Sequence, residues 1–266
     1  MTLRKQRPVA LTIAGSDSGG GAGIQADLKT FAALGVHGTS AIACLTAQNP
    51  KRVLRIEVCS PKMLRQQIEA VFEELNPCAV KTGMLYSANN IKVVADFFNR
   101  RPAISNRQLV IDPVFVSTSG AKLLEPTALQ ILKKNLLPLA TLVTPNLSEA
   151  EILSGRKISS LEDMRDVARR IHSQFGCAAL VKGGHLRGSS EAADIFYDGK
   201  TELLLTAPFV KGIRTHGTGC IYSAAVCAAL AKGKNLPHAV KIGKEFVTAA
   251  ISGSYKIGNH FALGLR

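Results

Sequence analysis

Two alternating patterns run along the chain and limit what it can fold into. Short runs rich in Val, Ile and Leu predict buried strands at 9–14, 79–82, 109–112, 141–144 and 178–182. Between them, apolar residues spaced three or four apart predict helices at 24–34, 64–75 and 164–175. Strands that alternate with helices form a mostly parallel central sheet with helices on both faces, a three-layer α/β sandwich.

Local signals at the helix ends agree with these boundaries. Gly35 is expected to end the first helix, and Ser60 before Pro61 is expected to cap and open the second. Ser160 and Asp163 have the spacing of a capping box at the start of the third. Pattern and caps therefore predict the same elements.

Asp198 and Gly199 interrupt the alternation. They separate two strand-like segments, 193–197 and 201–206, and an Asp-Gly pair is a strong signal for a two-residue hairpin turn. We therefore expect an antiparallel hairpin at one edge of the sheet. No linker, repeat or low-complexity tract divides the sequence, so residues 1–266 are predicted to form a single domain.

Composition excludes several classes of protein. The chain has 266 residues, of which 46% are hydrophobic, enough for a large core. Its richest apolar run, 221–231, falls short of the roughly 18 residues that a membrane helix needs. The six cysteines form no Cys-x-x-Cys pair, which favours buried free thiols in a reducing compartment. We expect a cytoplasmic protein that does not engage a membrane.

The net charge of +14 raises the possibility of nucleic-acid binding. However, no run of Lys and Arg exceeds a pair, and no aromatic residues interleave with them. We predict solvated basic faces and no nucleic-acid partner. The rival reading predicts an affinity that collapses with added salt.

The candidate site residues follow the predicted strands, because ligands bind beyond the carboxyl ends of the strands in open α/β sheets. After the first strand comes a Gly-rich turn, residues 15–23, that opens a helix. Its N–H groups suit a phosphate or a polar ring, although a tight strand-to-helix turn explains the same glycines. The turn does not match the P-loop pattern.

Polar residues follow three later strands. Asp112 precedes a proline, where an acid binds a metal, accepts a proton or forms a turn. Asn146 and Glu149 lie one helical turn apart, which suits ligands on one side of a helix and equally a helix cap. Lys182 precedes two glycines and is suited to contact a phosphate.

A second Gly-rich turn, Thr215-His-Gly-Thr-Gly-Cys220, precedes a helix of small residues. The N–H groups of Gly217, Thr218 and Gly219 are expected to form an anion hole for a transferring phosphoryl group. Cys220 lies where a helix dipole favours the thiolate. The alternative is that Cys220 is only a small residue that packs beneath the Gly-rich turn. With the acidic residues and the lysine, these turns predict phosphoryl transfer from Mg-ATP to a small acceptor.

Seven segments carry a resemblance to a known family: 14–29, 46–49, 81–85, 110–114, 144–149, 181–185 and 215–220. They resemble the hydroxymethylpyrimidine/phosphomethylpyrimidine kinases of the ribokinase-like superfamily, in order and over nearly the whole chain. The resemblance implies a ribokinase-like fold, ATP and Mg²⁺ as cofactors, and a homodimer. It also implies phosphorylation of 4-amino-5-hydroxymethyl-2-methylpyrimidine, and then of its monophosphate, in thiamine biosynthesis.

The resemblance assigns roles to individual residues. Four residues are expected to bind the substrate. Gln48 would lie at the edge of the pyrimidine and Met84 against its ring, and Gly15 and Ala22 would line the same pocket. Those expected to hold Mg²⁺ are Asp112 and Glu149, and those expected to bind the nucleotide are Lys182, Asn146 and Thr144. The expected catalytic residues are the base Cys220 and the anion-hole residues Gly217, Thr218 and Gly219. Many sugar kinases of the superfamily carry an Asp base where Cys220 stands.

Two features bear on the range of substrates. Phe115 stands where the family pattern has Met, and its bulk is expected to narrow the pocket. For the second phosphorylation, the N–H groups of residues 20–23 are a candidate holder for the phosphate of the monophosphate.

Two rival functions stay open. A pyridoxal kinase of the same fold acts on a similar small aromatic alcohol, but Gln48 and Met84 favour the pyrimidine. The second rival is a non-catalytic pyrimidine-binding protein, which would bind the pyrimidine without turnover of ATP. Such a protein would not need the residues that are expected to contact the phosphates of ATP.

Overall fold

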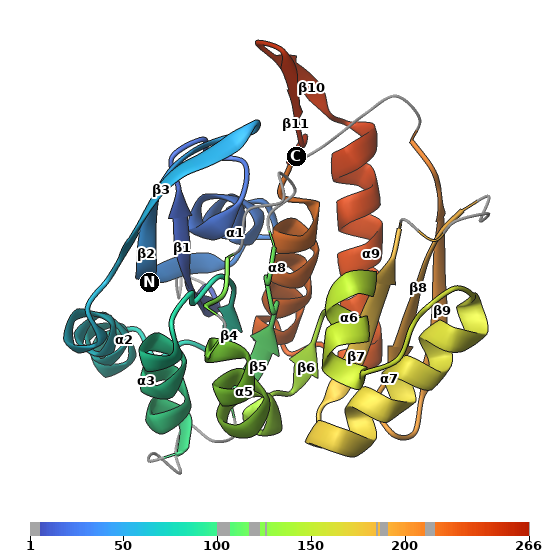
Figure 1. Ribbon diagram of the computed structural model, residues 1–266. Coiled ribbons are helices and arrows are strands. Elements are labelled where there is room, and N and C mark those ends of the chain that lie inside the picture. Colours follow the sequence, from blue (N-terminus) through green and yellow to red (C-terminus); the bar gives the residue numbers. More distant parts are fainter. Residues whose placement is uncertain are drawn as a thin grey trace, which may run out of the picture.

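A sheet of nine strands forms the centre of the computed structural model (Figure 1), as far as the described residues show. The structure describes residues 6–99, 107–116, 123–125, 127–184, 186, 191–210 and 216–265. The strands are β1 (Val9–Asp17), β2 (His37–Asn49), β3 (Arg52–Val58), β4 (Ala79–Thr82), β5 (Gln108–Ile111), β6 (Leu142–Val143), β7 (Ala178–Gly183), β8 (Glu191–Tyr197) and β9 (Glu202–Pro208).

The strand order is β3-β2-β1-β4-β5-β6-β7-β8-β9. The six strands from β2 to β7 in this order pair in parallel, whereas β3 at one edge and β8–β9 at the other pair antiparallel. The predicted parallel sheet and its edge hairpin are therefore confirmed. The antiparallel strand at the opposite edge was not predicted.

Helices cover both faces of the sheet (Figure 1). One face packs against α1 (Gly23–Ala33), α8 (Thr218–Ala231) and α9 (Leu236–Ser252). The other packs against α2 (Pro61–Glu74), α3 (Ala88–Asn99), α5 (Ala128–Ile131), α6 (Leu147–Ser154), α7 (Leu161–Phe175), the π-helical turn η1 (Leu132–Leu136) and the 3-10 turn η2 (Leu137–Leu139). The three-layer sandwich is thus confirmed; that residues 1–266 form one domain stays a prediction.

The predicted caps are present. The Ser60 hydroxyl accepts the Met63 N–H, and Ser160 and Asp163 form a reciprocal capping box. The strand predicted at 141–144 is shorter, only Leu142–Val143, and β1 continues past residue 14 to Asp17.

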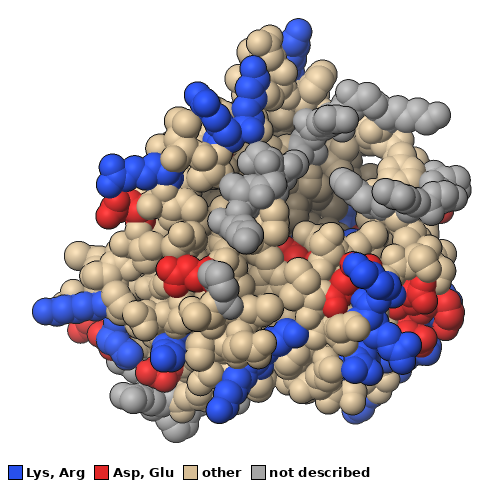
Figure 2. Space-filling view, in the orientation of Figure 1, with Lys and Arg blue, Asp and Glu red and all other residues tan. Residues whose placement is uncertain are grey.

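The chain ends in a small hairpin, β10 (Tyr255–Ile257) and β11 (His260–Ala262), which projects from the body of the molecule (Figure 1). No helix in the described part of the chain combines the length and apolarity needed to cross a membrane. On the face shown in Figure 2, Lys and Arg lie in several separate groups, with acidic residues beside some of them, rather than in one continuous stripe.

Candidate active site

The residues predicted to meet at one edge of the sheet do so. Asp112 follows β5 directly, Lys182 lies near the end of β7, and the turn before α8 reaches the same point. The Lys182 Nζ atom lies 2.9 Å from Asp112 Oδ1. A Cβ atom on Gly219 would lie 3.2 Å from Lys182 Nζ and 3.9 Å from Asp112 Oδ2. Loops more than a hundred residues apart in sequence thus form one site.

Asp112 is buried, and it forms an ion pair with the largely buried Lys182. Burial acts to raise the pKa of Asp112, but Lys182, Lys81 and the hydrogen bonds to the carboxylate together outweigh it and hold the pKa below its ordinary value. Ser223 of α8 donates to Asp112 Oδ2 at 3.3 Å, and the Thr144 hydroxyl lies 3.4 Å from Oδ1. The carboxylate is therefore ionised, and Thr144 lies beside it rather than at the surface.

Asn146 and Glu149 cap α6 and face this ion pair. The Asn146 side chain accepts the Glu149 N–H at 3.0 Å, and Glu149 Oε2 accepts the Asn146 N–H at 2.9 Å. Asn146 also bridges to Lys182 through the backbone. Burial raises the pKa of Glu149, against the lowering effect of Lys182. Asn146 and Glu149 therefore cap α6 and also lie at the site, so the two interpretations of these residues do not exclude each other.

The link from Asp112 to α6 is strained. Val114 has a φ of 47°, a left-handed conformation that is costly for a β-branched residue. This turn brings the Phe115 N–H to Glu149 Oε1 at 3.2 Å. The Phe115 side chain packs in the main core, whereas Val114 packs beside Met84. That the bulk of Phe115 narrows the pocket stays a prediction.

The second Gly-rich turn lies against the first. Gly217 is the N-cap of α8, with a φ of 87° that favours glycine. A Cβ atom there would overlap the Gly21 carbonyl and lie 3.2 Å from Ala22 Cα. For the N–H groups of Gly219 and Cys220, no acceptor is found among the described residues. Thr215 and His185, which belong to the matching segments, lie outside the described residues.

Cys220 lies in the first turn of α8, where a helix dipole acts to stabilise a thiolate. Burial nevertheless raises the pKa of this thiol to about 11, although Lys81 acts to lower it. The expectation that the dipole favours the thiolate is therefore wrong for the free protein.

The Asp17 carboxylate lies within the first Gly-rich turn and accepts hydrogen bonds from the backbone of that turn. Asp17 accepts the N–H groups of Gly19 at 2.8 Å, Gly21 at 3.2 Å and Ala22 at 2.8 Å, while the Gly20 N–H donates to the Asp17 carbonyl. Every N–H from residue 19 to residue 22 thus has a partner. These groups do not offer an empty anion site, and the prediction that residues 20–23 hold a phosphate is contradicted by this arrangement.

Two of the residues expected at the substrate ring, Gly15 and Met84, pack together. A Cβ atom on Gly15 would lie 2.9 Å from Cys44 Sγ and 3.4 Å from Met84 Sδ, so glycine is required for this close approach. Met84, Cys44 and Leu123 form a small buried cluster of their own. The structure brings Gly15 and Met84 together as expected.

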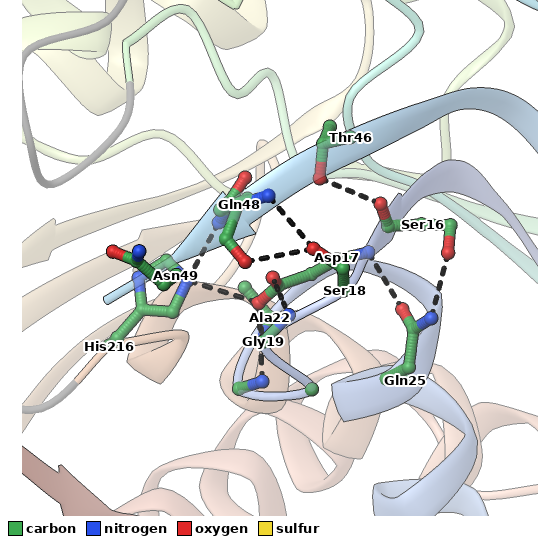
Figure 3. A network of polar contacts seen from close by, with 12 residues as sticks. Ser16, Asp17, Ser18, Gly19, Ala22, Gln25, Thr46, Gln48, Asn49 and His216 are labelled. Atoms are coloured by element: carbon green, nitrogen blue, oxygen red, sulfur yellow. Dashed lines mark hydrogen bonds and ion pairs between the residues drawn. The ribbon is translucent and has the colours of Figure 1, made fainter. Parts of the chain in front are cut away.

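Gln48 lies at the end of β2, near both Gly-rich turns (Figure 3). Its backbone N–H and carbonyl are both held by the Ser18 hydroxyl, each at 2.8 Å. Its amide nitrogen lies 3.0 Å from His216 Nε2, and that atom lies 3.2 Å from Asp17 Oδ2. Sequence reasoning gave no role to Asp17 or His216, because their contact spans 199 residues.

A second buried ion pair, also missed, lies beneath the site. Lys81 Nζ lies 2.9 Å and 3.0 Å from the two oxygens of Asp27, and both side chains are fully buried. Thr12 donates to the same carboxylate at 2.6 Å. The pair joins α1 to β4 and β1, and its Lys81 end lies 3.0 Å from where a Cβ atom on Gly83 would be. A lysine between Val80 and Thr82 in a predicted strand was the signal for it.

Known proteins share both the sequence and the fold. The family model for phosphomethylpyrimidine kinase matches residues 17–263. A hydroxymethylpyrimidine/phosphomethylpyrimidine kinase from Rhizobium meliloti is 48% identical over 94% of this chain and 92% of its own. The structure of a phosphomethylpyrimidine kinase from Clostridium difficile is 42% identical and covers 92% of this chain and 100% of its own, with a TM-score of 0.81. A Staphylococcus aureus pyridoxal kinase in complex with AMP-PCP and pyridoxal is 34% identical and covers 97% of this chain and 93% of its own, with a TM-score of 0.87.

The sandwich and the phosphate-end site together define a small-molecule kinase of the ribokinase-like class. Within that class, the chain belongs to the phosphomethylpyrimidine kinase family. The resemblance seen in the sequence is therefore confirmed.

Proposed function

We propose that the chain transfers the γ-phosphoryl group of ATP to 4-amino-5-hydroxymethyl-2-methylpyrimidine, and then phosphorylates the monophosphate to the diphosphate, in thiamine biosynthesis. The observation that carries this proposal is that the Asp112–Lys182 ion pair lies directly beside the turn at Gly219. Relatives named for this activity and the AMP-PCP of the Staphylococcus aureus structure support it.

In the first transfer, the acceptor hydroxyl loses its proton as its oxygen bonds to the γ-phosphorus, and ADP leaves with the electrons of the broken P–O bond. Lys182 turns from Asp112 towards the phosphates, and the N–H groups of Gly217, Thr218 and Gly219 receive the charge on the transferring group. Cys220 is the nearest candidate to accept the proton. Because its thiol is protonated in the free protein, we expect the base to form only once the substrates are bound.

The residues present fit a Mg²⁺ ion. Asp112 and Glu149 are buried carboxylates whose oxygens keep lone pairs beyond the bonds that they accept. The described residues contain no cluster of three or more metal-ligating side chains, and Mg²⁺ commonly takes one or two carboxylates and completes its shell with phosphates and water. When bound, the ion would offset the negative charge of the phosphates. Asn146 is expected beside the nucleotide, with its side-chain oxygen already used in the cap.

The substrate is expected between Gln48 and the cluster at Met84, with Gly15 and Ala22 at its edge. Gln48 offers both a donor and an acceptor to the amino and ring-nitrogen edge of the pyrimidine. Met84 supplies a polarisable thioether against the ring. These residues lie on the side of the first Gly-rich turn, across from Lys182.

Product analysis by mass after incubation with ATP, Mg²⁺ and the hydroxymethylpyrimidine tests the proposal. Successive additions of one and two phosphoryl groups are expected. A parallel assay of ADP release with pyridoxal separates the alternative, which is supported if turnover of pyridoxal exceeds that of the pyrimidine. Binding of the pyrimidine without ADP release would instead indicate a non-catalytic binding protein.

The assembly and location are further proposals. A homodimer is expected from the family resemblance, and the exposed apolar residues Leu54 and Val58 on the edge strand β3 offer a surface for it. Light scattering after gel filtration measures its mass. The free thiols of all six cysteines support a reducing, cytoplasmic location. Filter binding at two salt concentrations tests the expected absence of specific nucleic-acid binding.

A further inference from the structure

Asp17 and His216 belong to the two Gly-rich turns, yet the proposed reaction uses neither. Asp17 ends β1 and is 4% exposed, and His216 immediately precedes the Gly217 cap. The His216 side chain is 17% exposed and its Nε2 atom lies between Asp17 Oδ2 and the Gln48 amide (Figure 3). The three side chains form a chain of polar contacts that ends at the expected substrate-binding amide.

The proton on His216 is set by Asp17. Burial acts to raise the pKa of Asp17, but His216 and the N–H groups of Gly19 and Ala22 outweigh it and hold the pKa below its ordinary value. An ionised carboxylate only accepts hydrogen bonds. The Nε2 atom of His216, which lies 3.2 Å from Asp17 Oδ2, therefore carries a proton and donates a hydrogen bond to Asp17.

That donor role determines how the Gln48 amide is turned. An Nε2 atom that carries a proton has no lone pair in the ring plane, so it cannot accept an N–H from the amide group 3.0 Å away. A half turn about the Cγ–Cδ bond exchanges the oxygen and nitrogen of an amide in place. The stable arrangement therefore sets the Gln48 oxygen against the His216 N–H, which it shares with Asp17 Oδ2 in a three-centre hydrogen bond, and turns the NH₂ group away from it. The backbone of Gln48 is already fixed by Ser18, so only the side chain responds.

We propose that His216, with its proton held by Asp17, is a positioning residue that selects which end of the Gln48 amide faces the substrate. The amide then presents its NH₂ group as a donor to an acceptor nitrogen in the edge of an aromatic heterocycle. This rests on the proposed substrate class and on Gln48 binding it. His216 acts through Gln48 and does not touch the reacting atoms.

The test is a double-mutant cycle in steady-state kinetics with the hydroxymethylpyrimidine. We expect His216→Leu to raise KM for the pyrimidine about tenfold, the effect of losing about one hydrogen bond, with kcat and the KM for ATP nearly unchanged. His216→Gln restores an N–H in a similar place, so its KM should return to within about threefold of the wild-type value. Gln48→Leu and the double variant His216→Leu/Gln48→Leu should have equal KM values, because His216 has no amide left to position.

The outcomes separate the failure of this inference from that of the proposed function. If the wild-type chain does not phosphorylate the pyrimidine, the proposed function fails and this inference fails with it. If the wild type is active but His216→Leu keeps its KM, or the two single effects multiply in the double variant, only the inference is overturned. His172→Leu is the matched control, since its Nδ1 bonds the Cys177 carbonyl far from the site, and it should change thermal stability but not KM.

Discussion

The two Gly-rich turns are alike in sequence but opposite in what their backbones offer. In the first, the N–H groups of residues 19–22 are all bound by the side chain or the carbonyl of Asp17. In the second, the N–H groups of Gly219 and Cys220 find no acceptor among the described residues, while Lys182 lies beside them. The first turn is already occupied by a fixed negative charge, and the second is open to an incoming one.

This difference shows that glycine content predicts close backbone approach but not anion binding. The second turn needs glycine at 217 because a Cβ atom there would overlap the Gly21 carbonyl, whereas a Cβ atom on Gly21 would lie 3.1 Å from the His216 ring. What separates them is one carboxylate within reach of the N–H groups. A phosphate brought to the first turn would meet Asp17, and the repulsion between two anions would oppose it. We therefore propose that the second turn is the phosphate end of the site.

The largest effect should come from filling the point where the turns cross. Gly217→Ala is expected to lower kcat about 10³-fold, because the new Cβ atom overlaps the Gly21 carbonyl and displaces the anion hole. Gly233→Ala is the matched control: its φ of 77° is similar, but a Cβ atom there meets nothing within 4 Å. It should cost about 1–2 kcal/mol of unfolding free energy and leave kcat unchanged. Equal kinetic losses in the two variants would contradict this account of the second turn.

The substitution Cys220→Ser should have the next largest effect on kcat, and it should affect the two phosphoryl transfers differently. The first acceptor is a hydroxyl that must lose a proton, whereas the phosphate of the monophosphate is largely ionised near neutral pH. We expect kcat to fall about 10²-fold for the hydroxymethylpyrimidine and much less for its monophosphate. Pyrimidine binding should stay nearly intact, and Cys78→Ser serves as a control. Equal losses on both acceptors would assign Cys220 to packing or to the anion hole.

The sequence allowed the central layout to be predicted but not its connections. Strand-end reasoning placed Asp112, Thr144 and Lys182 together because parallel strands end at one edge of the sheet. The strand β2 and the helix α9 were missed, since β2 mixes Gly, Thr, Ser and Ala with few large apolar residues. Which N–H groups are already bound depends on where Asp17 and His216 fold, and no periodic pattern records such a contact.

Removing the charge from the first turn should destabilise the fold. Asp17→Asn replaces an acceptor that holds three N–H groups with an amide that turns its own NH₂ towards some of them. We expect the unfolding free energy from urea titration at pH 7 to fall by about 1–3 kcal/mol. Asp163→Asn, in the exposed capping box of α7, should cost less because water replaces its bonds. A fully stable Asp17→Asn variant would show that the turn does not depend on this carboxylate.

The smallest effect should be the pH dependence of that same loss. The pKa of Asp17 is lowered in the folded protein, so its ionisation stabilises the fold above the pKa of the unfolded chain, about 4. This contribution is lost as the pH falls through the lower folded value. The stability difference between wild type and Asp17→Asn should therefore shrink as the pH falls below about 4. Because the other acidic residues titrate in both proteins, the difference isolates Asp17, and a gap that widened on acidification would mean that its pKa is raised instead.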